Sequence, residues 1–146
     1  MIDALDDKPS TAFWAISAAA LIWNLFGFIV YLMQVTASPD ALASAYTEAE
    51  VAFIQSTPAW ATSVFAIAAT AGVLACLMLL FRRAWAVPLF VVSFVAVMLQ
   101  NTHSFVLNDV VSIFGPAPAF IQVAVVSIGV AMIWYSRRAR QKRWLS

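Results

Sequence analysis

Charged residues are scarce in this 146-residue chain, and long stretches contain none. Asp, Glu, Lys and Arg make up 10% of the sequence, whereas about 25% is usual in soluble domains. Hydrophobic residues make up 64%, against about 45–50% in soluble domains. A soluble domain of this length has too little interior to hide that much apolar surface. The composition therefore excludes one and predicts that lipid covers much of the chain.

Residues that often carry chemistry are also few. The single cysteine, Cys76, excludes an internal disulfide, and the single histidine, His103, lacks the partners that a haem or zinc site needs. Only a dimer would bring two copies of His103 together. The sequence contains no HExxH pattern, phosphate-binding loop, paired carboxylates or Ser-His-Asp arrangement. We therefore predict no enzyme, no cofactor and no nucleic-acid partner.

What the chain does have is four long apolar runs, each close to the roughly 20 residues that cross a bilayer. They are 13–35, 60–81, 85–107 and 119–136, and none has a charged residue in its interior. The first exceeds the core of a signal peptide, about 7–15 residues, and lacks a basic segment before it. We expect a retained anchor there, although Val35-Thr36-Ala37 fits a small-residue cleavage pattern.

Basic residues lie at one end of all four runs. Arg82 and Arg83 follow the second run, Lys8 precedes the first, and 137–146 holds five more after the fourth. The connections after the first and third runs contain no Lys or Arg. The positive-inside rule places the basic end, and with it both termini, in the cytoplasm. The basic tail 137–146 fixes this topology, and its charge also suits anionic lipid head groups.

The first outer loop, 36–59, is long enough to contain structure. Ser38 and Pro39 are typical of a helix N-cap followed by proline at the first helical position. Thr47 and Glu50 have the spacing of a capping box. We therefore predict two short helices that lie on the outer surface.

Small residues indicate how the spans pack, because helices in lipid associate most closely where side chains are small. Ala68, Gly72 and Cys76 recur every four residues in the second span, which predicts a central position for that helix. Ser127 and Ala131 are four apart in the fourth. The predicted fold class is all-α: a single polytopic membrane domain over 1–146, built as an up-down four-helix transmembrane bundle.

Neutral polar side chains gather toward the outer half of the predicted spans. The candidate polar layer consists of Asn24, Tyr31, Gln34, Gln100, His103 and Gln122. Gln100 and His103 are three apart, so we expect them on one helical face. One interpretation is a pocket for an uncharged polar ligand. The other is interhelical hydrogen bonding, worth about 0.6 kcal/mol per bond on average.

Several short motifs resemble a family of short bacterial inner-membrane proteins commonly labelled "sugar transporter". They are Trp23-Asn24-x-x-Gly27, Tyr31-Leu32-Met33-Gln34, Pro58-Ala59-Trp60, Ala86-Val87-Pro88 and Trp134-Tyr135-Ser136. The resemblance covers nearly the whole chain. It implies the four-span topology and a bacterial inner membrane, and it assigns no mechanism or binding residue.

Two functions follow as alternatives. The first is transport or binding of a small neutral polar solute from the outer side. Four helices are few for a solute path, so a transporter would act as a homo-oligomer. The absence of an acidic residue inside the spans disfavours a proton-coupled carrier. The second is a non-catalytic accessory or scaffolding subunit of a membrane-protein complex. A water-lined outer cavity favours the first, and an exposed small-residue stripe favours the second.

Overall fold

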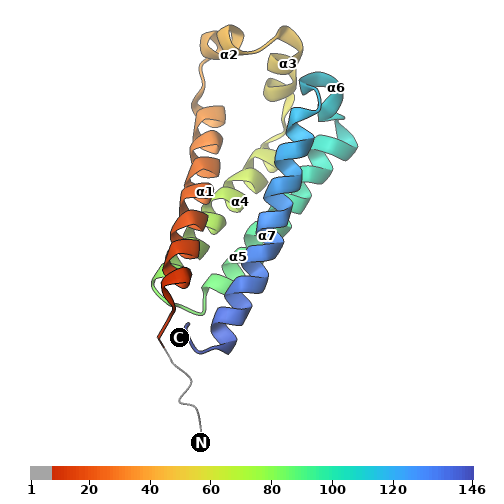
Figure 1. Cartoon of the computed structure of the whole chain (residues 1–146). Helices are drawn as coiled ribbons and strands as arrows, with labels where there is room; N and C mark the ends of the chain where they lie inside the picture. Colours follow the sequence, from red (N-terminus) through yellow and green to blue (C-terminus); the bar gives the residue numbers. More distant parts are fainter. Residues whose placement is uncertain (1–7) are drawn as a thin grey trace, which may run out of the picture.

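The structure is a computed structural model that describes residues 8–146, and every regular element in that part is helical (Figure 1). The long elements are α1 (Thr11–Thr36), α4 (Ala59–Leu80), α5 (Ala86–Asn101) continued by the π-helix η1 (Thr102–Leu107), and α7 (Ala117–Gln141). The short ones are α2 (Pro39–Ala45), α3 (Glu48–Ser56) and α6 (Val110–Phe114). The acidic residues Asp3, Asp6 and Asp7 lie outside the described residues.

Four of these segments are long and apolar enough to cross a membrane: α1, α4, α5 with η1, and α7. The chain is therefore a multi-pass integral membrane protein, and the predicted all-α polytopic bundle is confirmed. The first three spans begin and end within two residues of the predicted positions. The fourth is longer than hydropathy predicts, because α7 continues through the first basic residues to Gln141.

Helix α4 is the most buried of the four spans, in agreement with its small residues. It packs against α5 and α1. Ala68, Gly72 and Cys76 are all buried, together with Ala71 and Ala75. Because these side chains are small, both neighbouring helices approach α4 closely.

The end of the chain folds under the bundle instead of extending as a free tail. We call this end of the bundle, which also holds the turn between α4 and α5, the base. Ser146 N donates to Arg82 O at 2.7 Å, and Ala84 N donates to Ser146 O at 2.8 Å. Arg82 Nε donates to Trp144 O at 2.8 Å, and Leu145 is buried. The basic segment 137–146 is thus partly helix and partly a closed turn.

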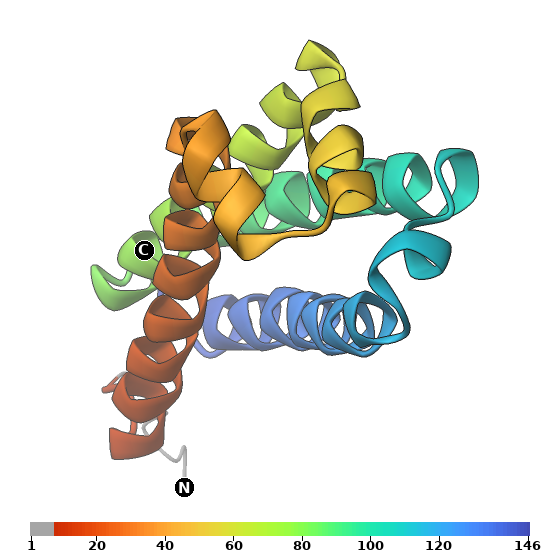
Figure 2. The same cartoon turned by 90° about the horizontal axis from the view of Figure 1, so that it is seen from above.

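Two short helices occupy the first connection, as predicted, and we call α2 and α3 the roof (Figures 1 and 2). The Ser38 side chain caps α2, and Thr47 with Glu50 forms the capping box of α3. The roof rests on α6 through Phe114, whose ring makes edge contacts with Phe53 and Tyr46 at 5.5 and 6.4 Å. It therefore spans the distance from the end of α1 to α6.

The bundle is open on one side. Helices α1 and α7 meet near the base, where the Phe13 ring lies 6.4 Å from Tyr135 and 5.7 Å from Trp144. From there the two helices diverge toward the roof (Figures 1 and 2). Bulky side chains such as Phe26 and Ile121 face this opening and line it. Large side chains keep helices apart, so α1 and α7 do not close on each other as α1 and α4 do.

Candidate functional site

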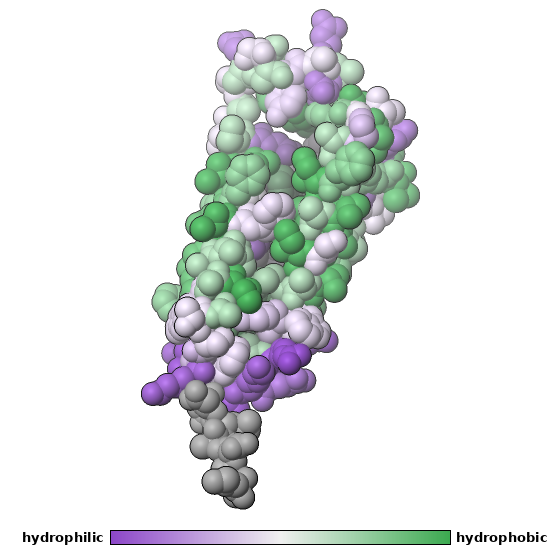
Figure 3. Space-filling view, viewed as in Figure 1, coloured by the Kyte–Doolittle hydropathy of each residue, from purple (hydrophilic) through white to green (hydrophobic). Residues whose placement is uncertain are grey.

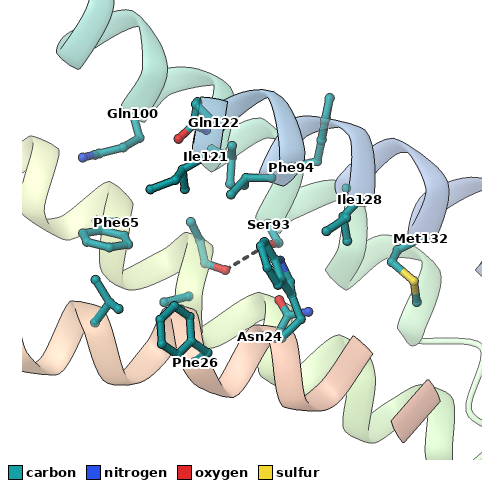
Figure 4. A pocket seen from close by; sticks show the side chains of 18 of the residues that line it. Asn24, Phe26, Phe65, Ser93, Phe94, Gln100, Ile121, Gln122, Ile128 and Met132 are labelled. Atoms are coloured by element: carbon teal, nitrogen blue, oxygen red, sulfur yellow. Dashed lines mark hydrogen bonds between the residues drawn. The ribbon is translucent and has the colours of Figure 1, made fainter. Parts of the chain in front are cut away.

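A groove of about 270 Å³ lies between α1 and α7, with α4 and α5 as its floor (Figure 4). The space-filling view shows the surface hollowed between these helices below the roof (Figure 3). Phe26 and Ile121 line opposite sides, and Phe65, Phe90 and Phe94 contribute aromatic rings from the floor. The groove thus opens sideways, at the depth where lipid tails surround the protein.

Four neutral polar side chains line this groove, and no charged one does. They are Asn24, Ser93, Gln100 and Gln122. Two of them are bonded to the helices. Ser93 Oγ donates to Ala68 O at 2.8 Å, while Asn24 Nδ2 donates to Ala20 O at 2.9 Å and to Cys76 Sγ at 3.4 Å. These bonds join α1 and α5 to α4, so Asn24 and Ser93 have a structural role in the floor.

Gln100 and Gln122 are different, because neither side chain makes a hydrogen bond to the described residues. Gln100 Oε1 is buried and has no partner. Gln100 is near the end of α5 and Gln122 near the start of α7, so both lie at the same end of the groove (Figure 4). A buried acceptor without a donor costs about 1–3 kcal/mol. This end of the groove therefore holds two amide side chains that the described residues leave without a hydrogen bond.

The structure brings together three of the six residues of the predicted polar layer. Asn24, Gln100 and Gln122 line the groove, whereas Tyr31, Gln34 and His103 do not. The Tyr31 ring packs edge-on against Phe65 at 5.3 Å. Gln34 is half-buried and makes no side-chain hydrogen bond to the described residues.

His103 faces α4 instead of the groove. Its ring packs edge-on against Trp60 at 5.1 Å, and its Nε2 lies 3.2 Å from Asn108 Nδ2. Gln100 lines the groove and His103 does not, and the π-helix η1 begins between them at Thr102. A π-turn holds more residues than an α-turn, so it rotates the side chains that follow out of α-helical register.

Sequence reasoning missed Ser93 and the aromatic floor. The signal was present: Ser93 precedes Gln100 by seven residues, two helical turns, so the two side chains share a face. Phe90 and Val97 continue that face at the same helical spacing, and both line the groove. The pattern of four residues marks the side of α5 that faces the opening.

The chemistry of the groove is that of its neutral lining. Its side chains offer amides, a hydroxyl and apolar surface, with no titratable group among them. Among residues 8–146, no three His, Cys, Asp or Glu side chains are grouped to hold a metal ion.

Comparisons with protein-family models, with curated proteins and with solved structures found no match to this chain. The fold and the site themselves define the class, which is a multi-pass integral membrane protein with a groove that opens sideways between two of its spans.

Proposed function

We propose that the protein binds a small uncharged amphiphile in the groove between α1 and α7. The observation that supports this most directly is the buried, unpartnered Gln100 Oε1 beside Gln122. If the Gln100 amide turned toward the groove, a ligand that donates one hydrogen bond would satisfy an acceptor that the helices leave unsatisfied. Its apolar part would lie along the Phe65 and Phe94 rings.

The lining narrows the kind of solute. Moving a charge into an apolar site without a counter-charge costs far more than a hydrogen bond returns, so the solute is neutral. The sequence predicts a small neutral polar solute. A solute with many polar groups would leave most of them unpaired against the aromatic floor. The volume of about 270 Å³ is near the lower end of ligand pockets, about 300–1,000 Å³. A short alkyl chain or ring with one or two hydroxyl groups fits these limits.

The distribution of charged residues supports one orientation of the protein in the membrane. Lys8, Arg82 and Arg83 lie at the base. The remaining basic residues, at the end of α7 and just after it, lie there too: Arg137, Arg138, Arg140, Lys142 and Arg143. The roof carries Asp40, Glu48 and Glu50. By the positive-inside rule the base faces the cytoplasm of a bacterial inner membrane and the roof faces outward. The ligand would then reach the groove from the outer side or from the outer leaflet.

Binding has more support than complete passage through one chain. The groove narrows to the contact of Phe13 with Tyr135 and Trp144. A transported solute would have to separate these rings or pass between two copies of the protein. The family resemblance, with its label "sugar transporter", is compatible with a neutral hydroxyl-bearing ligand.

Filling the groove tests the proposal. A Cβ at Gly27 would meet no atom within 4 Å, and Gly27 lines the groove. Gly27→Leu should therefore place a branched side chain in the binding space without a clash in the backbone. Ala131→Leu, on the exposed outer side of α7, adds the same side chain elsewhere. Mass spectrometry of small molecules that co-purify in mild detergent should show one lost in Gly27→Leu and retained in Ala131→Leu. Equal retention in both variants would overturn the proposal.

A second candidate is an accessory subunit that binds another membrane protein, or a second copy of itself, through α7. Ser127 and Ala131 lie one turn apart on α7, and both are exposed in the folded bundle. Ser127 Oγ donates to Val123 O of its own helix at 2.7 Å, so the surface is both small and satisfied. A partner helix would pack closely there. In that case Ala131→Leu should release a co-purified protein, and Gly27→Leu should not.

A further inference from the structure

A second hollow, of about 390 Å³, lies on the surface of α7 near its end. It is lined by Trp134, Arg137, Arg138, Gln141 and Lys142. The spacings of three, one, three and one residues place all five on one face of the helix. We call this set the basic stripe. It is separate from the groove, which is lined by Val125, Gly129, Met132 and other α7 residues on a different face.

The cations of the basic stripe have no carboxylate partner among residues 8–146. Arg138 lies over the Trp134 ring at 5.3 Å and Lys142 over the Trp144 ring at 4.7 Å. Arg137 makes no side-chain hydrogen bond or ion pair with the described residues. The acidic residues that the structure describes are at the far end of the molecule: Asp40, Glu48 and Glu50 in the roof, and Asp109 at the start of α6. The stripe therefore carries three positive charges that the described part of the protein leaves unneutralised.

These side chains are not needed to end the helix. The carbonyls of its last turn are bonded by the backbone, with Lys142 N donating to Arg138 O and Arg143 N donating to Arg140 O, both at 3.0 Å. The guanidinium and ammonium groups are thus free to bind an external anion. Arginine is well suited to phosphate, because its planar group donates two parallel hydrogen bonds.

The surroundings of the stripe indicate what bears that anion. Trp134 is 59% exposed, and tryptophan is typical of the membrane interface. On the side of the membrane interior, Val130 and Val123 are 54% and 67% exposed. A molecule bound here would have its anionic group among the basic side chains and an apolar part against α7. We propose that the basic stripe binds the phosphodiester head group of an anionic phospholipid, whose acyl chains lie along the exposed valines.

The test compares lipid selectivity in two matched triple variants. Arg137→Gln with Arg138→Gln and Lys142→Gln removes the stripe. Arg83→Gln with Arg140→Gln and Arg143→Gln removes the same charge from the same end of the molecule, at exposed positions outside the stripe. The full chain is reconstituted in phosphatidylcholine bilayers with spin-labelled phosphatidylglycerol or spin-labelled phosphatidylcholine. Electron paramagnetic resonance then gives the relative association of the two lipids with the protein. All samples keep the same amino-terminal residues, so any contribution from these is common to them.

We expect phosphatidylglycerol to be preferred by the unmodified protein and by the second triple variant. The first triple variant should lose the preference, by up to about fivefold for each cation in contact with a head group. Equal losses in both triple variants would show general attraction to the base and would overturn a defined site. Inorganic phosphate added at constant ionic strength should not displace the lipid. Full displacement would assign the stripe to free phosphate and would also overturn the proposal.

Discussion

The side chain of Asn24 on α1 occupies the space that a side chain at Gly72 on α4 would need. A Cβ built at Gly72 falls against Asn24 Oδ1, and it also comes within 3.2 Å of Ser93 Oγ. Asn24 Nδ2 donates to Cys76 Sγ at 3.4 Å, one turn along the same helix. Three helices therefore meet at a point where only glycine fits.

This contact makes Gly72→Ala destabilising. The methyl group displaces the Asn24 amide and breaks its bond to Cys76, and such overpacking costs about 1–3 kcal/mol. Gly27→Ala is the matched control, because its Cβ meets nothing within 4 Å and alanine favours a helix by about 0.5–1 kcal/mol. Denaturant unfolding of both variants in the same detergent should show a lower unfolding free energy for Gly72→Ala only. Similar values for both would mean that α1 adjusts freely at this position.

Ser93→Ala should cost little but measurably. It removes the 2.8 Å hydrogen bond to Ala68 O, which joins α5 to α4. Hydrogen bonds between membrane helices are worth about 0.6 kcal/mol on average. Ser127→Ala removes a bond of similar length, 2.7 Å, but to Val123 of the same helix. The same unfolding assay should detect no loss for Ser127→Ala, and a larger loss there than for Ser93→Ala would contradict the structure.

Cys76 should be protected from alkylation while the protein is folded. It is fully buried between α4 and α1. N-ethylmaleimide should react with Cys76 more than about tenfold slower than with an exposed thiol. A local opening that costs only about 1.4 kcal/mol already lowers the exposed fraction, and with it the rate, tenfold. Ser44→Cys in a Cys76→Ala background supplies the exposed thiol. Mass spectrometry of the protein in detergent measures both alkylation rates. Comparable rates for Cys76 and for Ser44→Cys would mean that the α1–α4 interface opens readily.

Phe114→Ala should loosen the roof without unfolding the spans. The variant loses the ring contacts to Phe53 and Tyr46, each worth about 0.5–1.5 kcal/mol beyond the area it buries. Hydrogen exchange in α2 and α3 should become faster, while exchange in α4 stays unchanged. Phe120→Ala, whose ring is 71% exposed on α7, is the control and should leave the roof unaffected.

The orientation can be checked in intact cells. In a Cys76→Ala background, a membrane-impermeant maleimide should label Ser44→Cys in α2 directly. It should label Gln141→Cys, at the end of α7, only after the membrane is permeabilised. Both positions are exposed in the fold, so access depends on the side of the membrane. The reverse pattern would place the base outside.

Hydropathy and capping rules predict most of the helices, because these depend on near neighbours in the chain. The capping pair Thr47 and Glu50 is an example, since both of its hydrogen bonds form within three residues. Helix α7 continues beyond the apolar run for a reason of the same kind. Arg and Gln end an apolar run but are good helix formers, so the helix continues past Arg137.

The groove depends on distant parts of the chain, so the sequence predicts only part of it. Where α1 lies relative to α7 follows from the size of side chains that meet in space, such as Phe26 and Ile121. By contrast, helical spacing alone predicts that Ser93 and Gln100 lie on the same face of α5. The π-helix at Thr102–Leu107 is also not predicted, because no residue type in that segment is specific to such a turn.

Beyond its contact with α7 near the base, α1 is held by α4, through Asn24 and Tyr31, and by the roof. Phe13 is fully buried near the base, and Thr36 at the other end of α1 is roughly 35 Å away at 1.5 Å per residue. Each degree of rotation about Phe13 would move that end by about 0.6 Å, and the groove would widen with it. The roof connects the moving end to α6 through Phe114. We therefore expect the aromatic contacts of the roof to restrict how far the groove can widen.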